Sequence, residues 1–111
     1  MAQEIHICDY IAKRKDSDVI VDLREKRMYD FGTIEGAVNI PLDDIAKLYS
    51  LPKDKDIYVF CQAGEISPEI AELLCDAGYN AYDLAGGYRE YLRKHIAKNA
   101  CETCEAKGDI K

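Results

Sequence analysis

One stretch of the sequence decides the fold: residues 57–74, which read IYVFCQAGEISPEIAELL. Its first residues, Ile57 to Phe60, are all apolar and alternate aliphatic with aromatic side chains, which is typical of a strand buried on both faces. A short loop follows, and Ser67-Pro68 predicts the start of a helix, with the serine hydroxyl as N-cap and the proline at the first helical position. The stretch therefore predicts a strand, a loop and a helix, with Cys61 at the carboxyl end of the strand.

The same alternation of strands and helices extends outward in both directions. Strands are predicted at 19–21 and 37–40, and at the two ends of the domain at 5–7 and 80–82. Apolar residues at helical spacing predict helices with the faces Leu42, Ile45, Ala46, Tyr49; Ile70, Leu73, Leu74, Ala77; and Tyr88, Tyr91, Leu92, His95, Ile96. Shorter helices are predicted at 9–13 and 24–29, and Gly78 is expected to close the helix before it. The pattern predicts an α/β domain: a central, mostly parallel five-stranded sheet with helices on both faces.

Length and composition allow one domain. The chain has 111 residues, of which 48% are apolar and 32% charged, a globular balance. No apolar run approaches the ~20 residues of a membrane span, and the N-terminus does not resemble a signal peptide. We expect the domain to occupy residues 4–98 and residues 99–111, which lack periodicity, to form a flexible cysteine-containing tail.

Net charge indicates which kinds of partner to expect, and cysteine content indicates the cellular compartment. The net charge of −6 argues against binding to nucleic acid or to an anionic membrane surface. Five cysteines without a secretory signal argue for reduced thiols rather than a disulfide framework, and so for a cytoplasmic protein.

Cys61 is the main candidate for chemistry. A loop that curls round its sulfur would point backbone N–H groups inward, and the positive end of the following helix would add to this anion cradle. Such a field lowers the pKa of a thiol and favours the nucleophilic thiolate. The alternative is a small buried apolar residue that ends a core strand. Gly64 and the helix start at Ser67-Pro68 favour the nucleophile.

Four segments, in this order along the chain, resemble the rhodanese-like (sulfurtransferase) family over residues 4–97. They are Asp22-Leu23-Arg24-Glu25, GTIEGAVNIP at 32–41, CQAGEIS at 61–67 and NAYDLAGGY at 80–88. The resemblance implies the three-layer rhodanese-like fold.

The resemblance also implies a persulfide mechanism. Cys61 would take a sulfane sulfur from thiosulfate or a low-molecular-weight persulfide and pass it to cyanide or a thiol, including a protein thiol. The substrate- and anion-binding loop would comprise Gln62, Ala63, Gly64, Glu65, Ile66 and Ser67. Asp22 and Arg24 would support this loop, or would form a purely structural ion pair. No organic cofactor and no metal are implied. The alternative function is a sulfur carrier or protein-interaction module without turnover.

Departures from the family pattern bear on the substrate. The loop is six residues long, Cys61 to Ile66, and the position where the related phosphatases carry a closing arginine is Ser67, so phosphatase activity is disfavoured. Glu65 stands where many members have a basic residue or a hydroxyl, which predicts poor affinity for thiosulfate unless its side chain points outward. Thr33 stands where the family often has histidine, and we expect one polar contact to be lost there.

The remaining cysteines have several interpretations. Cys101 and Cys104 form a C-x-x-C pair that could accept sulfur from Cys61, form a redox pair or be incidental. Half a zinc site is a further interpretation, but a second ligand pair is lacking. Cys8 and Cys75 fall at predicted helical positions and are expected to be inert core thiols. The oligomeric state is left open by the sequence.

Overall fold

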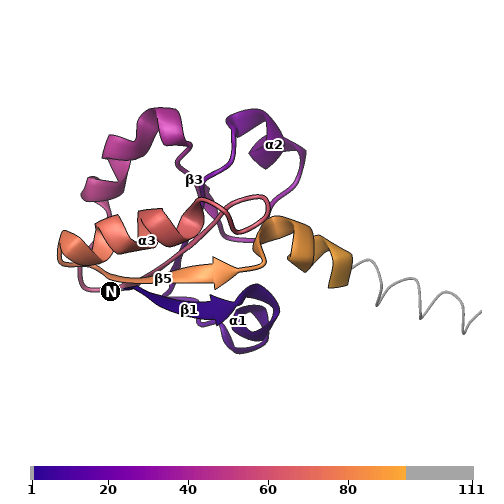
Figure 1. Ribbon diagram of the computed structural model, residues 1–111, viewed down its shortest axis with the longest axis horizontal. Helices are drawn as coiled ribbons and strands as arrows, with labels where there is room; N and C mark the ends of the chain where they lie inside the picture. Colours follow the sequence, from indigo (N-terminus) through magenta and orange to yellow (C-terminus); the bar gives the residue numbers. More distant parts are fainter. Residues whose placement is uncertain (1, 95–111) are drawn as a thin grey trace, which may run out of the picture.

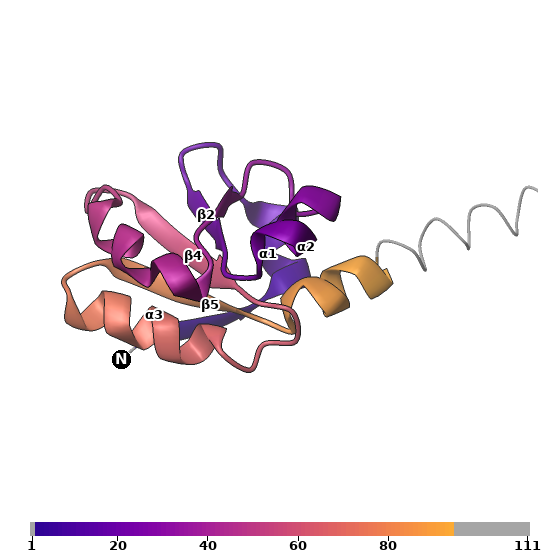
Figure 2. The same ribbon diagram turned by 90° about the horizontal axis from the view of Figure 1, so that it is seen from above.

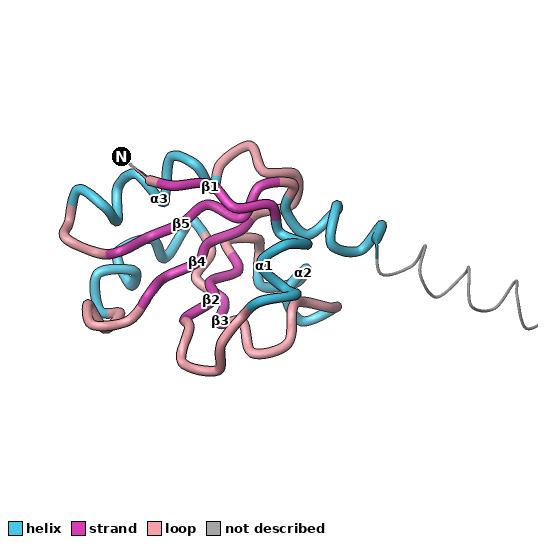
Figure 3. The backbone as a smooth tube through the Cα atoms, turned by 90° about the horizontal axis from the view of Figure 1, so that it is seen from below, coloured by secondary structure: helices cyan, strands magenta, loops and turns pink. Residues whose placement is uncertain are grey.

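The computed structural model describes residues 2–94 and has a five-stranded parallel sheet (Figure 1). The strands lie in the order β1-β5-β4-β2-β3, which Figure 3 shows across the sheet, and each neighbouring pair is parallel. Their bounds are β1 Gln3–His6, β2 Val19–Asp22, β3 Val38–Asn39, β4 Asp56–Phe60 and β5 Asn80–Ala85. The predicted α/β class and parallel sheet are confirmed. The predicted tail at 99–111 lies outside the described residues.

Helices cover both faces of the sheet. Their bounds are α1 Ile7–Lys13, α2 Lys26–Phe31, the 3₁₀ segment η1 Leu42–Ser50 and α3 Ser67–Asp76. A further helix begins at Gly87 and is described as far as Lys94; we call it the Gly87 helix. In Figures 1 and 2, α3 and η1 lie side by side, and both pack on one face, while α1 and the Gly87 helix pack on the other. Within residues 2–94, no helix has the length and apolarity to cross a membrane.

Strand β4 shows why the sheet is buried on both sides. Ile57 and Val59 join the core beneath α3, whereas Tyr58 and Phe60 join the core beneath α1, because successive side chains of a strand point to opposite faces. All four are buried, and each aliphatic or aromatic side chain so placed contributes about 1.5–3 kcal/mol. The apolar residues 57–60 therefore belong to the central strand of the sheet, between β5 and β2.

Helix α3 ends where the sequence predicts. The N–H of Gly78 bonds the carbonyl of Cys75 at 3.0 Å, and the N–H of Tyr79 bonds that of Leu74 at 2.9 Å. These two bonds form a Schellman motif, which needs a left-handed residue, and Gly78 has φ +97°. The chain can then turn directly into β5.

The segment at 42–50 differs from its prediction. It forms 3₁₀ turns with a break at Asp44 instead of an α-helix. Because a 3₁₀ helix repeats every three residues, the stripe that packs on the core is Ile45, Leu48 and Leu51. Leu42 and Tyr49 of the predicted apolar face are exposed.

Smaller differences concern the ends and faces of other elements. The strand predicted at 37–40 is only two residues long, and Val38 in it is exposed at the edge of the sheet. Helix α1 begins two residues before the predicted range, and α2 begins and ends two residues later than predicted. In α3, Ala71 is buried where the predicted face has Leu73, whose side chain is exposed.

Candidate functional site

The site lies at the carboxyl edge of the sheet. Because all strands are parallel, their carboxyl ends meet at this edge, which is where open α/β sheets bind ligands. Asp22 ends β2, Asn39 ends β3, and Cys61 directly follows the last residue of β4. The arrowheads of β1 and β5 in Figure 1 point toward the Gly87 helix, which begins at the same edge.

The sulfur of Cys61 is enclosed by the loop that follows it. The residue is 5% exposed, and the backbone N–H of Ile66 donates to its Sγ at 3.4 Å. Burial raises the pKa of the Cys61 thiol, but hydrogen bonds from the backbone N–H groups of Ile66, Ser67 and Gly64 and a hydrogen bond between the thiol and the Ser67 side chain lower it. The net pKa lies below the ordinary cysteine value, so the surroundings favour the thiolate.

The Gly87 helix holds the other side of this loop. Its free backbone N–H groups donate to the loop's first carbonyls: Tyr88 to Cys61 at 2.8 Å and Arg89 to Gln62 at 2.9 Å. This approach requires a glycine at 87, because a Cβ there would lie 2.5 Å from the Cys61 carbonyl oxygen. The carbonyl groups of Cys61 and Gln62 therefore accept hydrogen bonds from the Gly87 helix, whereas N–H groups later in the loop bond the Cys61 sulfur.

Ser67 does not cap α3, so the predicted N-cap role is wrong. Ser67 is the first helical residue, Ile66 occupies the cap position without a side-chain bond, and Pro68 is second. The Ser67 hydroxyl turns inward instead: it lies 3.6 Å from Cys61 Sγ and donates to Asp83 Oδ1 at 2.5 Å. Cys61, Ser67 and Asp83 are all buried, so they form a continuous chain of polar groups inside the domain.

Asp83 is the site residue that the sequence interpretation missed. It lies in β5 between the buried residues Ala81 and Leu84, and burial raises the pKa of its carboxyl, opposed by the hydrogen bond from Ser67 and aided by the charge of Glu4. Glu4 is its register partner on β1. The available signal was a charged residue inside an apolar strand, because such a residue needs a specific partner.

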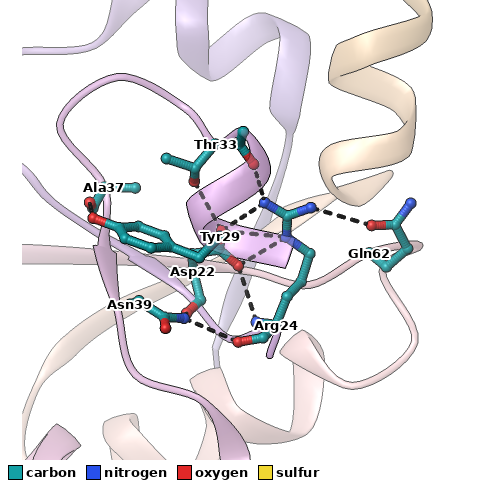
Figure 4. Close-up of polar contacts among 8 residues, drawn as sticks. Asp22, Arg24, Tyr29, Thr33, Ala37, Asn39 and Gln62 are labelled. Atoms are coloured by element: carbon teal, nitrogen blue, oxygen red, sulfur yellow. Dashed lines mark hydrogen bonds and ion pairs between the residues drawn. The ribbon is translucent and has the colours of Figure 1, made fainter. Parts of the chain in front are cut away.

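Asp22 and Arg24 form a buried ion pair that also reaches the loop (Figure 4). Arg24 donates from Nε to Asp22 Oδ1 at 3.0 Å and from Nη2 to Oδ2 at 2.8 Å. Its Nη2 also donates to the Gly32 carbonyl, its Nη1 donates to Gln62 Oε1 at 3.4 Å, and its guanidinium lies 4.0 Å from the Tyr88 ring centroid. Asp22 and Arg24 are therefore a buried ion pair, and Arg24 also contacts the Cys61 loop through Gln62.

Two neighbours complete this cluster. Thr33, where the family often has histidine, makes a polar contact of its own: its Oγ1 donates to Asp22 Oδ2 at 2.8 Å. Asn39 Nδ2 donates to the carbonyls of Asp22 and Arg24 at 3.0 and 2.9 Å, as Figure 4 shows for Arg24. These bonds fix the backbone between β2 and α2.

The other predicted site residues differ in how much of their surface is exposed to solvent. Gln62, Glu65 and Ile66 are exposed at the surface of the loop, and Ala63 and Gly64 are half-buried. Cys75 donates to the carbonyl of Ala81, and burial raises the pKa of Cys8. Cys101 and Cys104 lie outside the described residues. Between residues 2 and 94, no three His, Cys, Asp or Glu side chains are grouped as a metal site would need.

The structure thus places a buried thiol, with a pKa below the ordinary value, in a loop at the carboxyl edge of a parallel sheet. The profile described as "Rhodanese-like domain" matches residues 8–94. The chain belongs to the rhodanese-like family. The predicted family and the rhodanese-like fold are confirmed, and the sulfurtransferases among its relatives support sulfur transfer in general.

Known rhodanese-like proteins are similar over most of the domain. The human thiosulfate:glutathione sulfurtransferase is 33% identical over 91 residues, covering 68% of this chain and 79% of that protein. The structure of a rhodanese-related protein from Thermoplasma volcanium matches with a TM-score of 0.77 and 28% identity, covering 83% of this chain and 92% of that one. The chain spans only 22% of the adenylyltransferase and sulfurtransferase UBA4 of Meyerozyma guilliermondii, at 33% identity.

Proposed function

We propose that the chain is a sulfurtransferase that carries a sulfane sulfur as a persulfide on Cys61. The observation that carries this proposal is the Cys61 sulfur itself, which is buried, lies within a loop of backbone N–H groups and has a pKa below the ordinary value. The similarity to the human thiosulfate:glutathione sulfurtransferase and to the thiosulfate sulfurtransferase PspE of Escherichia coli supports it.

The first half-reaction loads the sulfur. The Cys61 thiolate attacks the outer sulfur of thiosulfate, the S–S bond of the donor breaks, and sulfite leaves with the electron pair. A low-molecular-weight persulfide reacts in the same way and releases its thiolate. The N–H groups of Gly64, Ile66 and Ser67 that lower the pKa of the thiol also stabilise the negative charge of the Cys61 persulfide.

The second half-reaction returns the enzyme to its starting state. An acceptor thiolate attacks the terminal sulfur of the persulfide, the S–S bond to Cys61 breaks, and Cys61 regains its thiolate. Cyanide reacts likewise and leaves as thiocyanate. Each half-reaction transfers one neutral sulfur atom and consumes no external oxidant or reductant.

Charge on the Glu65 side of the loop favours a persulfide donor over thiosulfate. Residues 62–66 contain no cationic side chain and include Glu65, which is exposed, and the whole chain has a net charge of −6. An incoming dianion is therefore repelled more than a donor of lower charge.

Intact-mass spectrometry tests the mechanism. The protein is incubated with thiosulfate and, separately, with glutathione persulfide, and we expect the mass of one added sulfur atom, more completely with the persulfide. Cys61→Ser should abolish the adduct, whereas Cys75→Ser, a matched change of a thiol outside the loop, should retain it. An adduct that survives Cys61→Ser would overturn the assignment, and no adduct from either donor would favour a binding module without turnover.

A further inference from the structure

A hollow of about 830 Å³ lies beside the Cys61 loop, between α2 and the Gly87 helix. Gln62, the residue after Cys61, lines one part of it. Its apolar lining consists of Met28, Phe31, Tyr88 and Leu92, and its charged lining of Arg24, Arg27, Arg89 and Arg93. We call this hollow the arginine groove.

The groove concentrates positive charge in an acidic protein. Four of the five arginines of the sequence line it, the exception being Arg14, and its lining includes no acidic residue. The guanidinium group pairs with carboxylate and phosphate oxygens in a bidentate manner. A cluster of this kind, in a chain with a net charge of −6, indicates a ligand with an anionic oxygen group.

Part of this charge is available to a ligand, chiefly that of Arg89. Arg24 is committed to Asp22. Arg27 pairs with Glu25 at 3.6 Å, both side chains are largely exposed, and such a pair contributes little. Arg93 holds the less exposed Glu90 through two hydrogen bonds, at 2.6 and 3.3 Å. Within the described part of the chain, Arg89 makes no ion pair with an acidic side chain.

Two of the four apolar lining residues, Met28 and Phe31, do not join the core, whereas Tyr88 packs partly against it. Helix α2 buries none of its residues, and Phe31 at its end is 97% exposed. Met28, one turn earlier on the same helix, is also exposed. Exposed apolar side chains that gather beside a charged rim mark a binding surface. An apolar segment of a ligand would cover them.

We propose that the arginine groove binds the body of the sulfur acceptor, and that this acceptor is a low-molecular-weight thiol with an apolar chain and a terminal carboxylate or phosphate. The inference rests on the proposed function, because it places the acceptor's sulfur at the part of the groove lined by Gln62, the residue that follows Cys61 in the chain. The volume of about 830 Å³ is in the range of small-molecule sites. Thiosulfate and cyanide lack an apolar body and would leave the groove empty.

A series of acceptors separates the two parts of the groove. The protein is first loaded with sulfur by glutathione persulfide and freed of excess donor, and its discharge by a thiol is then followed by mass spectrometry. The thiols are 8-mercaptooctanoate, the short anion 3-mercaptopropanoate and the neutral 8-mercaptooctanol. We expect 8-mercaptooctanoate to half-saturate the discharge rate at about a tenfold lower concentration than either of the others, equivalent to ~1.4 kcal/mol.

Exposed residues of the groove supply the variants. Phe31→Ser should raise the half-saturating concentration of both long thiols, because both lose the apolar contact. Arg89→Glu should raise that of 8-mercaptooctanoate and not that of 8-mercaptooctanol. The matched control is Arg14→Glu, the same charge reversal at the arginine outside the groove. Equal discharge by the three thiols, or equal effects of the two charge reversals, would overturn the proposal while leaving the persulfide mechanism intact.

Equilibrium binding tests the groove without turnover. Octanoate has the body and the charge but no sulfur, so titration calorimetry measures its affinity whether or not a persulfide forms. We expect saturable binding that Arg89→Glu weakens about tenfold and Arg14→Glu does not. Failure to load sulfur with octanoate binding retained would refute the proposed function alone, and absence of octanoate binding would refute the groove.

Discussion

At the scale of single residues, one proton decides how Cys61 is ionised. The Ser67 hydroxyl group lies between Cys61 Sγ and Asp83 Oδ1 and has a single hydrogen to donate. With Asp83 ionised, that hydrogen is held by the carboxylate and is lost to the sulfur. With residue 83 neutral and donating to Ser67, the hydrogen is free to bond the thiolate. The buried carboxyl therefore opposes ionisation of Cys61 through Ser67.

Two variants at this chain of groups should shift the reactivity of Cys61 in opposite directions. Asp83→Asn should lower the pH at which alkylation by iodoacetamide reaches half its maximal rate, because the amide can donate to Ser67. Ser67→Ala should raise that pH, because the polar group between the thiolate and the Asp83 carboxyl is lost. The exposed change Asp76→Asn serves as the control, and an unchanged profile in Asp83→Asn would show that the carboxyl does not act on the sulfur.

Ionisation of Asp83 should also change the stability of the domain with pH. Burial raises the pKa of its carboxyl, so the stabilisation from its protonated form is fully present below the unfolded pKa, near 4, and is lost as pH rises through the folded pKa. In Asp83→Asn this pH-dependent loss of stability is absent, because asparagine does not titrate. Urea unfolding should therefore show the variant gaining stability relative to the native protein as pH rises above the ordinary carboxyl pKa, near 4. A constant difference across this range would contradict the direction of the shift.

At the scale of secondary-structure elements, the site depends on the start of one helix. The Gly87 helix offers the backbone N–H groups of Tyr88 and Arg89 to carbonyls of the Cys61 loop, and α3 begins where the same loop ends. The loop is thus held between the starts of two helices. A change of backbone at either start displaces the N–H groups that face the sulfur.

A pair of glycine variants tests this dependence. Gly78 and Gly87 both have positive φ, so alanine at either position costs about 1–2 kcal/mol of conformational strain. At Gly87 the new Cβ would also lie 2.5 Å from the Cys61 carbonyl oxygen, whereas at Gly78 its nearest neighbour is Lys53 Nζ at 3.6 Å. We expect Gly87→Ala to lose more stability by urea unfolding and to load sulfur more slowly, and Gly78→Ala to lose stability alone. Similar loading rates in the two would refute the role of the Gly87 helix.

At the scale of the whole molecule, the Arg24 guanidinium connects segments that are distant in the sequence. It bonds Asp22 at the end of β2, the Gly32 carbonyl after α2 and Gln62 in the loop, and it lies over Tyr88 of the Gly87 helix. Asp22 is completely buried, so the pair lies where an unpartnered charge is costly. The ion pair therefore couples the stability of the domain to the geometry of the site.

Removing Arg24 from this pair should destabilise the domain, and removing the charge of Asp22 as well should restore part of the lost stability. Arg24→Met leaves the Asp22 carboxylate buried without its main partner and should cost about 3–5 kcal/mol of unfolding free energy. Adding Asp22→Asn removes that charge and should restore part of the loss. Arg27→Met, an exposed arginine nearby, should change stability by no more than about 0.5 kcal/mol. A double variant less stable than Arg24→Met would contradict the charge-burial argument, with urea unfolding as the measurement.

The sequence by itself determined the α/β class, the place of Cys61 after a buried strand and the close of α3 at Gly78. These features depend on the spacing of apolar residues and on local backbone preference, both of which are local properties of the chain. The tertiary structure decided the rest. Ser67 turns to Asp83 and Gln62 meets Arg24 because β4 lies between β5 and β2, an order that no local pattern encodes. The 3₁₀ turns of η1 and the arginine groove likewise arise from packing between segments, which gathers residues regardless of their separation in the sequence.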